Sequence, residues 1–414
     1  MNTTNVRLDC MRRTRCAEGK KDSSASLSKR QRSGFVADGS AFDVSAYVCD
    51  DKFANYFSQL KQVFLYITDR CNIACAQCIY KPSVNHSIRE EIPLSEAVGL
   101  LKAFRRLGAS KLTILGGEPT LYGYREEGKP LLSLIHAARA IGFKYIRLDT
   151  NGISIRHLLE DPGFAVIDEL AFSIDGFNSE LNDRLRGKGT FEAAIKSLKS
   201  ALEIGYNTTI TCCAHDKLLR RDPNSNVYLI EQMIKFAEQL GVTTINFHDL
   251  FKTGVPMDTW TGDFSPKPAD WVAMYNEVSE KIRRREFAIG IRLPQCFVSR
   301  CEFDKNPNYY GFCPVKLGER VMVHSDGSIR ICSNLICTAF RSGRYESGHI
   351  AWEDTHSNET AGHQLEEKTP CTNRSRHRSY GDLVPLCFSF KPGQSEYVWR
   401  AVLGWDARIK SREL

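Results

Sequence analysis

Short apolar runs alternate with longer amphipathic stretches through most of the chain. The apolar runs at 63–68, 111–115, 144–150, 167–174, 207–215 and 243–248 are rich in β-branched and aromatic residues, which indicates strands. Between them, apolar positions recur with helical spacing at 94–107, 130–141, 190–204 and 226–240. Glycines at 142, 205 and 241 mark helix ends, and a last amphipathic helix is predicted at 269–285.

This strand–helix alternation predicts an α/β fold with a parallel sheet and helices on its outer side. Six units are too few for a closed eight-stranded barrel and fit an open, partial (β/α)6 barrel. The chemistry of such folds lies at the C-terminal ends of the strands. A cysteine-rich loop and the pairs Gly116-Gly117, Asn151-Gly152 and Asp175-Gly176 all fall there.

The alternation of predicted strands and helices ends at about residue 286, after which Gly, Pro, Cys and polar residues dominate. Such a sequence predicts a small C-terminal domain built around metal rather than around a large apolar core. The expected organisation is a disordered basic tail at 1–40, a barrel core at 41–285, the small domain at 286–395 and a C-terminal tail at 396–414.

The charge of the chain is concentrated at its start. Residues 1–34 hold nine Lys and Arg against three Asp and Glu, which is +6 of the formal net charge of +7. A nearly neutral body argues against a nucleic-acid substrate. The sequence has no apolar run long enough to span a bilayer and no secretory signal pattern. These features predict a cytoplasmic protein without a membrane partner.

Fifteen cysteines without a secretory signal indicate reduced thiols or metal ligands rather than disulfides. Cys71, Cys75 and Cys78 lie together on the loop after the first strand. Three thiolates on one loop can hold three corners of a cubic iron–sulfur cluster, which leaves the fourth iron open to a substrate or cofactor. Zinc, which also takes thiolates, is the alternative.

Four ordered motifs at successive strand ends resemble the radical S-adenosylmethionine (SAM) superfamily. They are ITDRCNIACAQC at 67–78, GGEP at 116–119, TNG at 150–152 and SIDG at 173–176. The stretch 172–205 is similar to the subgroup that carries a SPASM or twitch auxiliary domain, and the resemblance covers roughly 60–390. The residue before the third cysteine, commonly aromatic in the family, is Gln77 here.

The resemblance implies that Cys71, Cys75 and Cys78 hold a [4Fe-4S] cluster whose open iron binds SAM. One electron, from a donor such as flavodoxin or ferredoxin, would cleave SAM to methionine and a 5′-deoxyadenosyl radical that abstracts a substrate hydrogen. The implied substrate is a small metabolite, a natural-product intermediate or a ribosomal peptide, and the outcome is oxidation, epimerisation or cross-linking. The alternatives are a peptide maturase with a separate leader-binding partner and a nucleic-acid-modifying radical enzyme.

The motif positions also imply cofactor contacts. Residues of the GGEP turn would line the methionine amino group, Ser173 would contact SAM, and Arg186 would pair with its carboxylate, with Arg184 as an alternative. Asn151 would reach the ribose or merely complete its turn. The residues of the turn are Gly116, Gly117, Glu118 and Pro119.

The C-terminal cysteines imply an auxiliary cluster. Cys313 and Cys332 flank a predicted hairpin that turns at 325–327, and their spacing around Gly327 resembles the start of the SPASM and twitch pattern. The other ligands would come from Cys301, Cys337, Cys371 and Cys387. One cluster is the favoured interpretation, and two clusters or a zinc site remain alternatives.

Two further pairs are candidates for catalysis. Cys212 and Cys213 end the fifth strand, and a thiol there could donate a hydrogen atom to a substrate radical. Because side chains alternate along a strand, only one of these thiols can face the cavity. His248 and Asp249 end the sixth strand and could act as a base. The competing interpretations are small buried core residues and a satisfied polar strand end.

Overall fold

The structure of the protein is a computed structural model of the 414-residue chain. It describes residues 43–78, 91–123, 126, 129–250, 264–310, 317–333, 341–353 and 380–387. The predicted tails at 1–40 and 396–414 lie outside these ranges.

A 12-stranded sheet in the order β1-β13-β12-β11-β10-β2-β3-β4-β5-β6-β7-β8 organises the described residues. The six predicted strands are β2 to β7, and neighbours among them pair in parallel. The strand bounds are β1 Val48–Cys49, β2 Gln62–Tyr66, β3 Lys111–Leu115, β4 Tyr145–Thr150, β5 Glu169–Ser173, β6 Thr208–Ala214, β7 Thr244–Asp249, β8 Gly290–Arg292, β10 Arg320–His324, β11 Ser328–Arg330, β12 Gly343–Glu346 and β13 His349–Trp352. A separate ladder joins β9 Phe297–Ser299 to β14 Leu383–Pro385.

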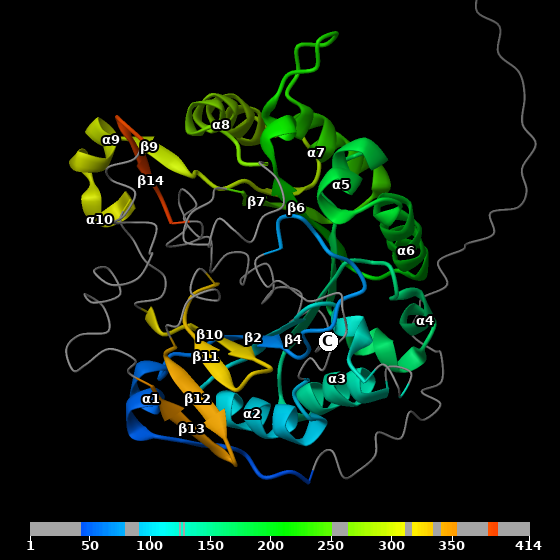
Figure 1. The fold of residues 1–414 in the computed structure, drawn as a ribbon, viewed down its shortest axis with the longest axis vertical. Coiled ribbons are helices and arrows are strands. Elements are labelled where there is room, and N and C mark those ends of the chain that lie inside the picture. Colours follow the sequence, from blue (N-terminus) through cyan, green and yellow to red (C-terminus); the bar gives the residue numbers. More distant parts are fainter. Residues whose placement is uncertain are drawn as a thin grey trace, which may run out of the picture. The chain divides into compact units, whose positions relative to one another are not determined.

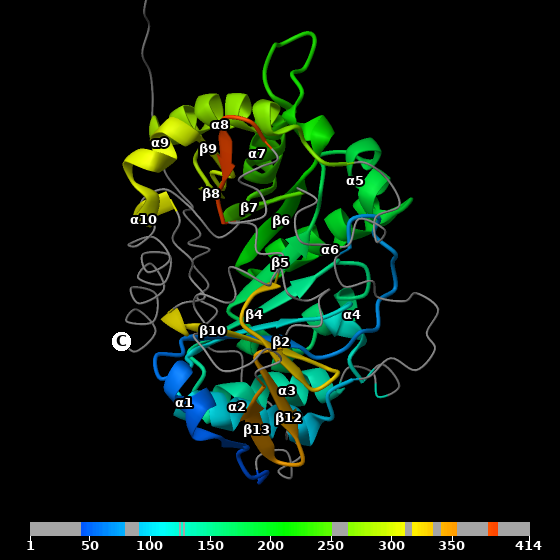
Figure 2. The ribbon, with the colours of Figure 1, turned by 60° about the vertical axis from the view of Figure 1, so that its left-hand side comes forward.

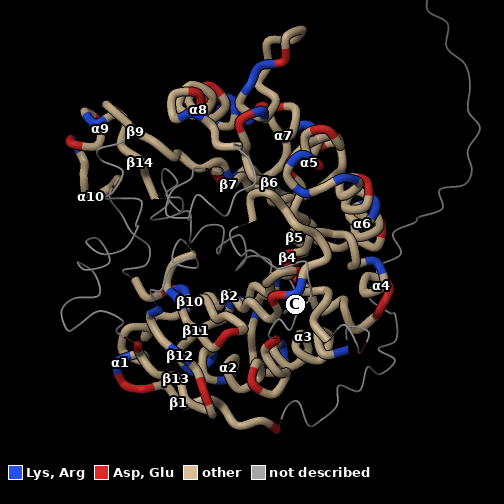
Figure 3. Tube along the Cα trace, viewed as in Figure 1, with Lys and Arg blue, Asp and Glu red and all other residues tan. Residues whose placement is uncertain are grey.

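Most of the helices lie on the outer side of the parallel strands (Figure 1). Their bounds are α1 Asp51–Tyr56, α2 Leu94–Arg106, α3 Lys129–Ile141, α4 Arg156–Leu159, α5 Ser179–Arg186, α6 Thr190–Ile204, α7 Leu229–Leu240, α8 Pro268–Arg283, α9 Arg300–Lys305 and α10 Pro307–Tyr310, with short 3-10 turns at Pro119–Leu121, Pro162–Val166 and Asp216–Leu219. Gly205 and Gly241 end α6 and α7 in the left-handed conformation, as predicted. Both signs of charge alternate along α5, α6 and α8 (Figure 3).

The main core lies between these helices and the outer face of the sheet. Alternate strand residues point outward, and most of them are apolar and buried, as in Leu112 and Ile114 of β3 or Ile146 and Leu148 of β4. The residues between them form what we call the inner face, the face of the sheet turned away from the helices. That face is rich in polar side chains on β4 to β7. This arrangement confirms the predicted α/β fold of a partial barrel.

The sheet extends beyond the six predicted strands at both edges. β8 pairs in parallel with β7, and β10 pairs in parallel with β2. The predicted hairpin is β10 and β11, and its turn contains Gly327 with φ of 83°. Two further strands, β12 and β13, continue the sheet, and β13 contacts α1, as Figures 1 and 2 show. The sheet is therefore continuous across the predicted domain boundary at 286.

No helix in the ranges that the structure describes is long and apolar enough to cross a membrane.

Candidate active site

The cysteine loop and the GGEP turn form one backbone unit at the C-terminal ends of β2 and β3. The Gly117 N–H donates to the Thr68 carbonyl at 2.7 Å, and the Glu118 N–H donates to the Arg70 carbonyl at 2.6 Å. A Cβ on Gly116 would stand 2.3 Å from the Thr68 carbonyl oxygen, and one on Gly117 would stand 2.2 Å from that of Arg70. Only glycine fits this approach, so the Gly-Gly pair fixes the start of the cysteine loop.

Glu118 joins the GGEP and TNG motifs from inside. Its carboxylate is fully buried and accepts hydrogen bonds from Thr120, from the Thr150 hydroxyl at 2.8 Å and from the Asn151 N–H at 2.7 Å. Burial raises the pKa of Glu118, and these hydrogen bonds oppose the rise. The side chain is thus engaged with its neighbours, which leaves the backbone of the turn to face a cofactor.

Asn151 lies against the cysteine loop. Its Nδ2 donates to Asn72 Oδ1 at 2.7 Å and lies 3.9 Å from Cys71 Sγ, while its Oδ1 accepts from the Ile153 N–H at 2.9 Å. Asn72 in turn donates to Ser154 Oγ at 2.8 Å. Of the two predicted roles, these contacts favour completion of the turn, and they also hold the chain beside Cys71.

Asp175, which we did not predict as a site residue, is the centre of the other half of the site. Its side chain is fully buried, and its Oδ2 lies 2.6 Å from Arg186 Nε. The same oxygen accepts from Gln77 Nε2 at 2.8 Å, and Oδ1 accepts from the Cys213 N–H at 2.7 Å. Arg186 Nη1 lies 4.0 Å from Cys75 Sγ. The SIDG motif thereby positions a guanidinium against the cysteine loop.

Gln77 replaces the family's usual aromatic residue with a polar link. It is 5% exposed, and its Nε2 reaches Asp175. Its Oε1 is buried and has no hydrogen-bond partner among the residues that the structure describes. A buried acceptor without a partner is costly, which is expected where a bound molecule supplies the donor.

The residues of the loop fit a cluster with an open coordination site. Cys71, Cys75 and Cys78 form no disulfides among the described residues, and Cys71 is buried. Burial raises the pKa of Cys71 to about 11 and also raises that of Cys75, whereas metal binding removes the proton outright. Within the described ranges, no three His, Cys, Asp or Glu side chains converge closely enough to hold a single ion.

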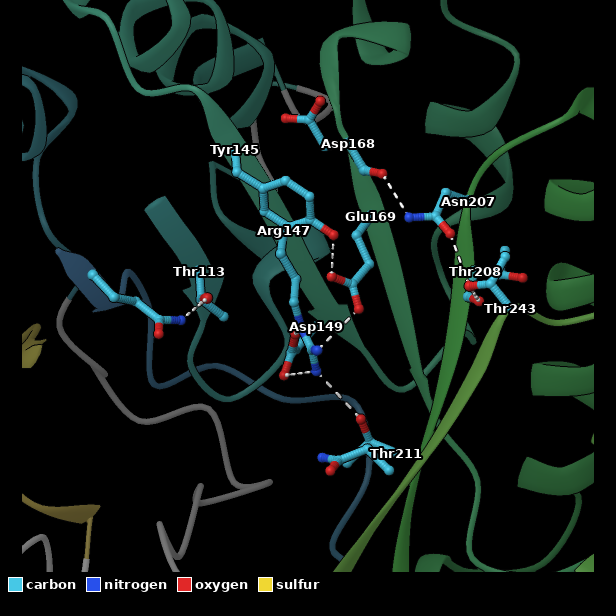
Figure 4. Close-up of polar contacts among 12 residues, drawn as sticks. Thr113, Tyr145, Arg147, Asp149, Asp168, Glu169, Asn207, Thr208, Thr211 and Thr243 are labelled. Carbon is cyan, nitrogen blue, oxygen red and sulfur yellow. Dashed lines mark hydrogen bonds and ion pairs between the residues drawn. The ribbon is translucent and has the colours of Figure 1, made fainter. Parts of the chain in front are cut away.

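The inner face below this loop contains a buried charge network (Figure 4). Arg147 binds Asp149 through Nε at 2.5 Å and Nη2 at 3.1 Å, and it binds Glu169 at 3.0 Å. Its Nη2 also lies 3.3 Å from Thr211 Oγ1, and the Tyr145 hydroxyl donates to Glu169 at 2.5 Å. Burial alone would raise the pKa of Glu169, but Arg147 and then Lys111 outweigh it and lower the value to about 2.

The predicted catalytic candidates divide between the two faces. Cys212 is fully buried in the core, whereas Cys213 is half-buried on the inner face and packs, like Ala76 of the cysteine loop, against a small apolar cluster that contains Leu185. His248 is exposed and its Nε2 lies 2.6 Å from Asn246 Nδ2. Asp249 instead lies 3.6 Å from Cys296 Sγ. The two strand-end residues therefore take different partners.

Of the other predicted residues, Ser173 is half-buried at the end of β5, and Pro119 begins a 3-10 turn capped by Glu118. Arg184, the alternative to Arg186, pairs with Asp216 at 2.5 Å. His324 stacks on Tyr66 with ring centroids 4.3 Å apart, and burial lowers its pKa to about 3.

The described residues include only part of the predicted auxiliary ligand set. Cys313, Cys337 and Cys371 lie outside them. Cys301 is exposed on α9, Cys332 is half-buried after β11, and Cys387 is buried after β14. The Leu386 N–H donates to the Cys296 carbonyl at 2.8 Å. The β9–β14 ladder therefore brings the buried Cys296, which was not among the predicted ligands, beside the segment that carries Cys387.

Residues 65–224 match the family described as the radical SAM superfamily, and the match contains the cysteine loop, GGEP, TNG and SIDG. The chain contains a radical SAM domain. It is 31% identical over 161 residues to a GTP 3′,8-cyclase of Vibrio parahaemolyticus, which covers 38% of this chain and 45% of that protein. It is 26% identical over 204 residues to a GTP 3′,8-cyclase of Haemophilus influenzae, covering 48% and 56%. The matched region thus spans about half the length of these curated relatives.

Solved structures with the same fold include Streptococcus suis SuiB bound to its precursor peptide SuiA, with a TM-score of 0.53 and 19% identity over 70% of this chain and 63% of that one. Another is anSMEcpe with bound AdoMet and the Cp18Cys peptide, with a TM-score of 0.50 and 18% identity over 69% and 77% of the two chains. At this identity the likeness establishes the radical SAM fold alone.

Proposed function

We propose that this protein is a radical SAM enzyme that carries a [4Fe-4S] cluster on Cys71, Cys75 and Cys78. The observation that carries the proposal is a loop with three cysteines, none in a disulfide, whose start is joined by backbone hydrogen bonds to a Gly-Gly turn at the C-terminal edge of a parallel sheet. When bound, the cluster and SAM supply a carbon-centred radical able to take a hydrogen atom from an unreactive position.

The chain's own residues would position the cofactor. The backbone of Gly116 and Gly117 would face the methionine end, and Gln77 Oε1, which has no hydrogen-bond partner among the described residues, offers an acceptor. Arg186 uses Nε toward Asp175, so its terminal nitrogens remain available for the SAM carboxylate as well as for Cys75. Ser173 ends β5 two residues before Asp175 and completes the predicted set.

The substrate is proposed to be a polar small molecule or a peptide that enters above the inner face. The GTP 3′,8-cyclase relatives support a small-molecule substrate, and the peptide in the SuiB structure supports a peptide modified with help from a partner. An electron donor such as flavodoxin or ferredoxin would be needed in either case. We further propose one auxiliary iron–sulfur cluster on C-terminal cysteines, with Cys313 and Cys332 as ligands and Cys296 added to the candidates.

The test is anaerobic reconstitution with iron and sulfide, followed by SAM and dithionite and detection of 5′-deoxyadenosine by mass spectrometry. We expect deoxyadenosine from the wild type and none from the variant with Cys71, Cys75 and Cys78 all changed to Ala. The matched control is Cys49→Ala, which removes a half-buried thiol outside the loop and should retain the product.

Iron analysis of the same samples tests the auxiliary site. About four iron atoms retained by the triple variant indicate one auxiliary cluster, and about eight indicate two. Loss of all iron from that variant contradicts the auxiliary cluster. Zinc in place of iron in the wild type would contradict the radical function itself.

A further inference from the structure

Arg292 is a half-buried cation on the inner face, and no carboxylate of the described residues is bound to it. It ends β8, where it pairs in register with Asn246, which pairs with Thr211. Residues in register on neighbouring parallel strands point to the same face of a sheet. Thr211 lies within 3.3 Å of Arg147, so this row of residues belongs to the inner face that Figure 4 shows.

The two acidic side chains of the network already bind other residues. Asp149 and Glu169 both bind Arg147, and Glu169 also accepts the Tyr145 hydroxyl. The Arg292 side chain makes no hydrogen bond or ion pair with any residue in the ranges that the structure describes. None of its nitrogens is among the fully buried atoms without a partner, so the guanidinium is open to solvent and can receive an anionic group from outside the chain.

The surrounding electrostatics show an excess of positive charge. Burial lowers the pKa of Lys111 to about 8; Glu169 opposes this, while Arg147 and Arg292 lower it further. The field of Arg292 also helps to lower the pKa of Glu169. Arg292 is therefore close enough to act on this network, in which three cations, Lys111, Arg147 and Arg292, meet two carboxylates.

We propose that Arg292 is the anchor of an anion-binding subsite on the inner face, which takes a phosphate or carboxylate group of the substrate. A guanidinium binds both groups bidentately, and Thr211 and Asn246 place a hydroxyl and an amide in the same row. Ser173, paired with Thr211, continues the row toward Asp175 and the cysteine loop. The anionic group would sit below the cofactor, with the reacting part of the substrate above it.

This inference rests on the proposed function for its substrate but can be tested without it. Anaerobically reconstituted full-length protein is titrated with inorganic phosphate, pyrophosphate or malonate at constant ionic strength, with chloride as reference, and the thermal midpoint is followed. We expect a saturable rise of the thermal midpoint with at least one of these anions. A stronger response to pyrophosphate identifies a phosphate subsite, and a stronger response to malonate identifies a carboxylate subsite.

Arg292→Gln should lower the affinity for the anion that binds the wild type by at least about tenfold, because a charge-assisted hydrogen bond is lost. Arg292→Lys keeps the charge without the bidentate geometry, so its affinity for the anion should lie between those of Arg292→Gln and the wild type. This second variant keeps the test decisive if Arg292→Gln folds poorly. The matched control, Arg283→Gln, removes an exposed guanidinium from the end of α8 and should bind as the wild type does.

The subsite is overturned if no probe binds the wild type better than chloride, or if both Arg292 variants bind as tightly as the wild type. Deoxyadenosine formation by the same wild-type preparation reports the proposed function separately. Cleavage of SAM without anion binding removes only the subsite, whereas anion binding without cleavage removes only the radical function.

Discussion

At the level of single residues, the carboxyl of Asp175 connects the cysteine loop, α5 and β6. Removing one partner of a buried ion pair costs about 3–5 kcal/mol, because the other charge is left unpaired. Asp175→Asn should therefore lower the free energy of unfolding of the cluster-free protein by an amount in this range, measured in urea. In the loaded protein, the loss of a negative charge near Cys75 should raise the reduction potential of the cluster.

The matched control is Glu180→Gln, which removes the carboxylate partner of Lys217. The Glu180 side chain is 78% exposed, so its loss should cost no more than about 1 kcal/mol. Equal losses of stability in the two variants would contradict a special position for Asp175.

The residues of the site were predictable from sequence to the extent that their signals are local. Three cysteines on one loop and a Gly-Gly pair after a strand could be recognised because a few neighbouring positions carry the pattern. The hydrogen bond from Gln77 to Asp175 joins residues 98 positions apart, and the sequence around either residue does not predict it. The role of Gln77 therefore required the structure.

At the level of elements, the predicted strands and helices lie within a few residues of the observed ones because each has a clear period. Residues 146–149 of β4 show apolar and polar residues in alternation, which indicates a polar inner face. β8 has only three residues, too few to show a period. The parallel pairing of β10 with β2 joins segments far apart in the chain, so local sequence could not reveal it.

The contact between two of these elements predicts the effect of Gly117→Ala. The added Cβ would meet the Arg70 carbonyl at 2.2 Å, and backbone cannot yield as a flexible side chain can. We expect a loss of about 1–3 kcal/mol in unfolding free energy, as for other overpacked sites, and reduced iron loading after reconstitution.

Gly348→Ala is the control for Gly117→Ala. Gly348 has φ of 84° and no atoms within 4 Å of an added Cβ, so this change strains the backbone without a clash. It should leave iron loading unchanged. Normal loading of Gly117→Ala would show that the close approach of the two motifs does not hold the cysteine loop in place.

At the level of the whole molecule, the charged side chains of the inner face lower the stability of the fold. A barrel that buried apolar side chains on both faces would be more stable than one with Arg147, Asp149 and Glu169 inside, because buried ion pairs seldom repay their desolvation. Such a polar face suits the polar substrate that we propose. The stability of the fold is therefore expected to depend on pH through groups that belong to the site.

Lys111 provides the measurable case. Its pKa is about 8 in the folded protein and near 10.5 in the unfolded chain, so between these values only the unfolded state holds the proton. The contribution of Lys111 to stability should therefore be constant below pH 8 and rise as the pH increases from 8 toward 10.5. The full rise is on the order of 3 kcal/mol.

The experiment compares urea unfolding of the wild type and Lys111→Met at intervals from pH 7 to 10, because other titrations cancel in the difference. The wild type should gain stability relative to Lys111→Met across this range. Lys144→Met removes an exposed lysine just before β4 and should show no comparable trend. A flat difference for Lys111→Met would mean that Lys111 keeps its ordinary pKa, and the excess of positive charge on the inner face would then be neutralised within the chain.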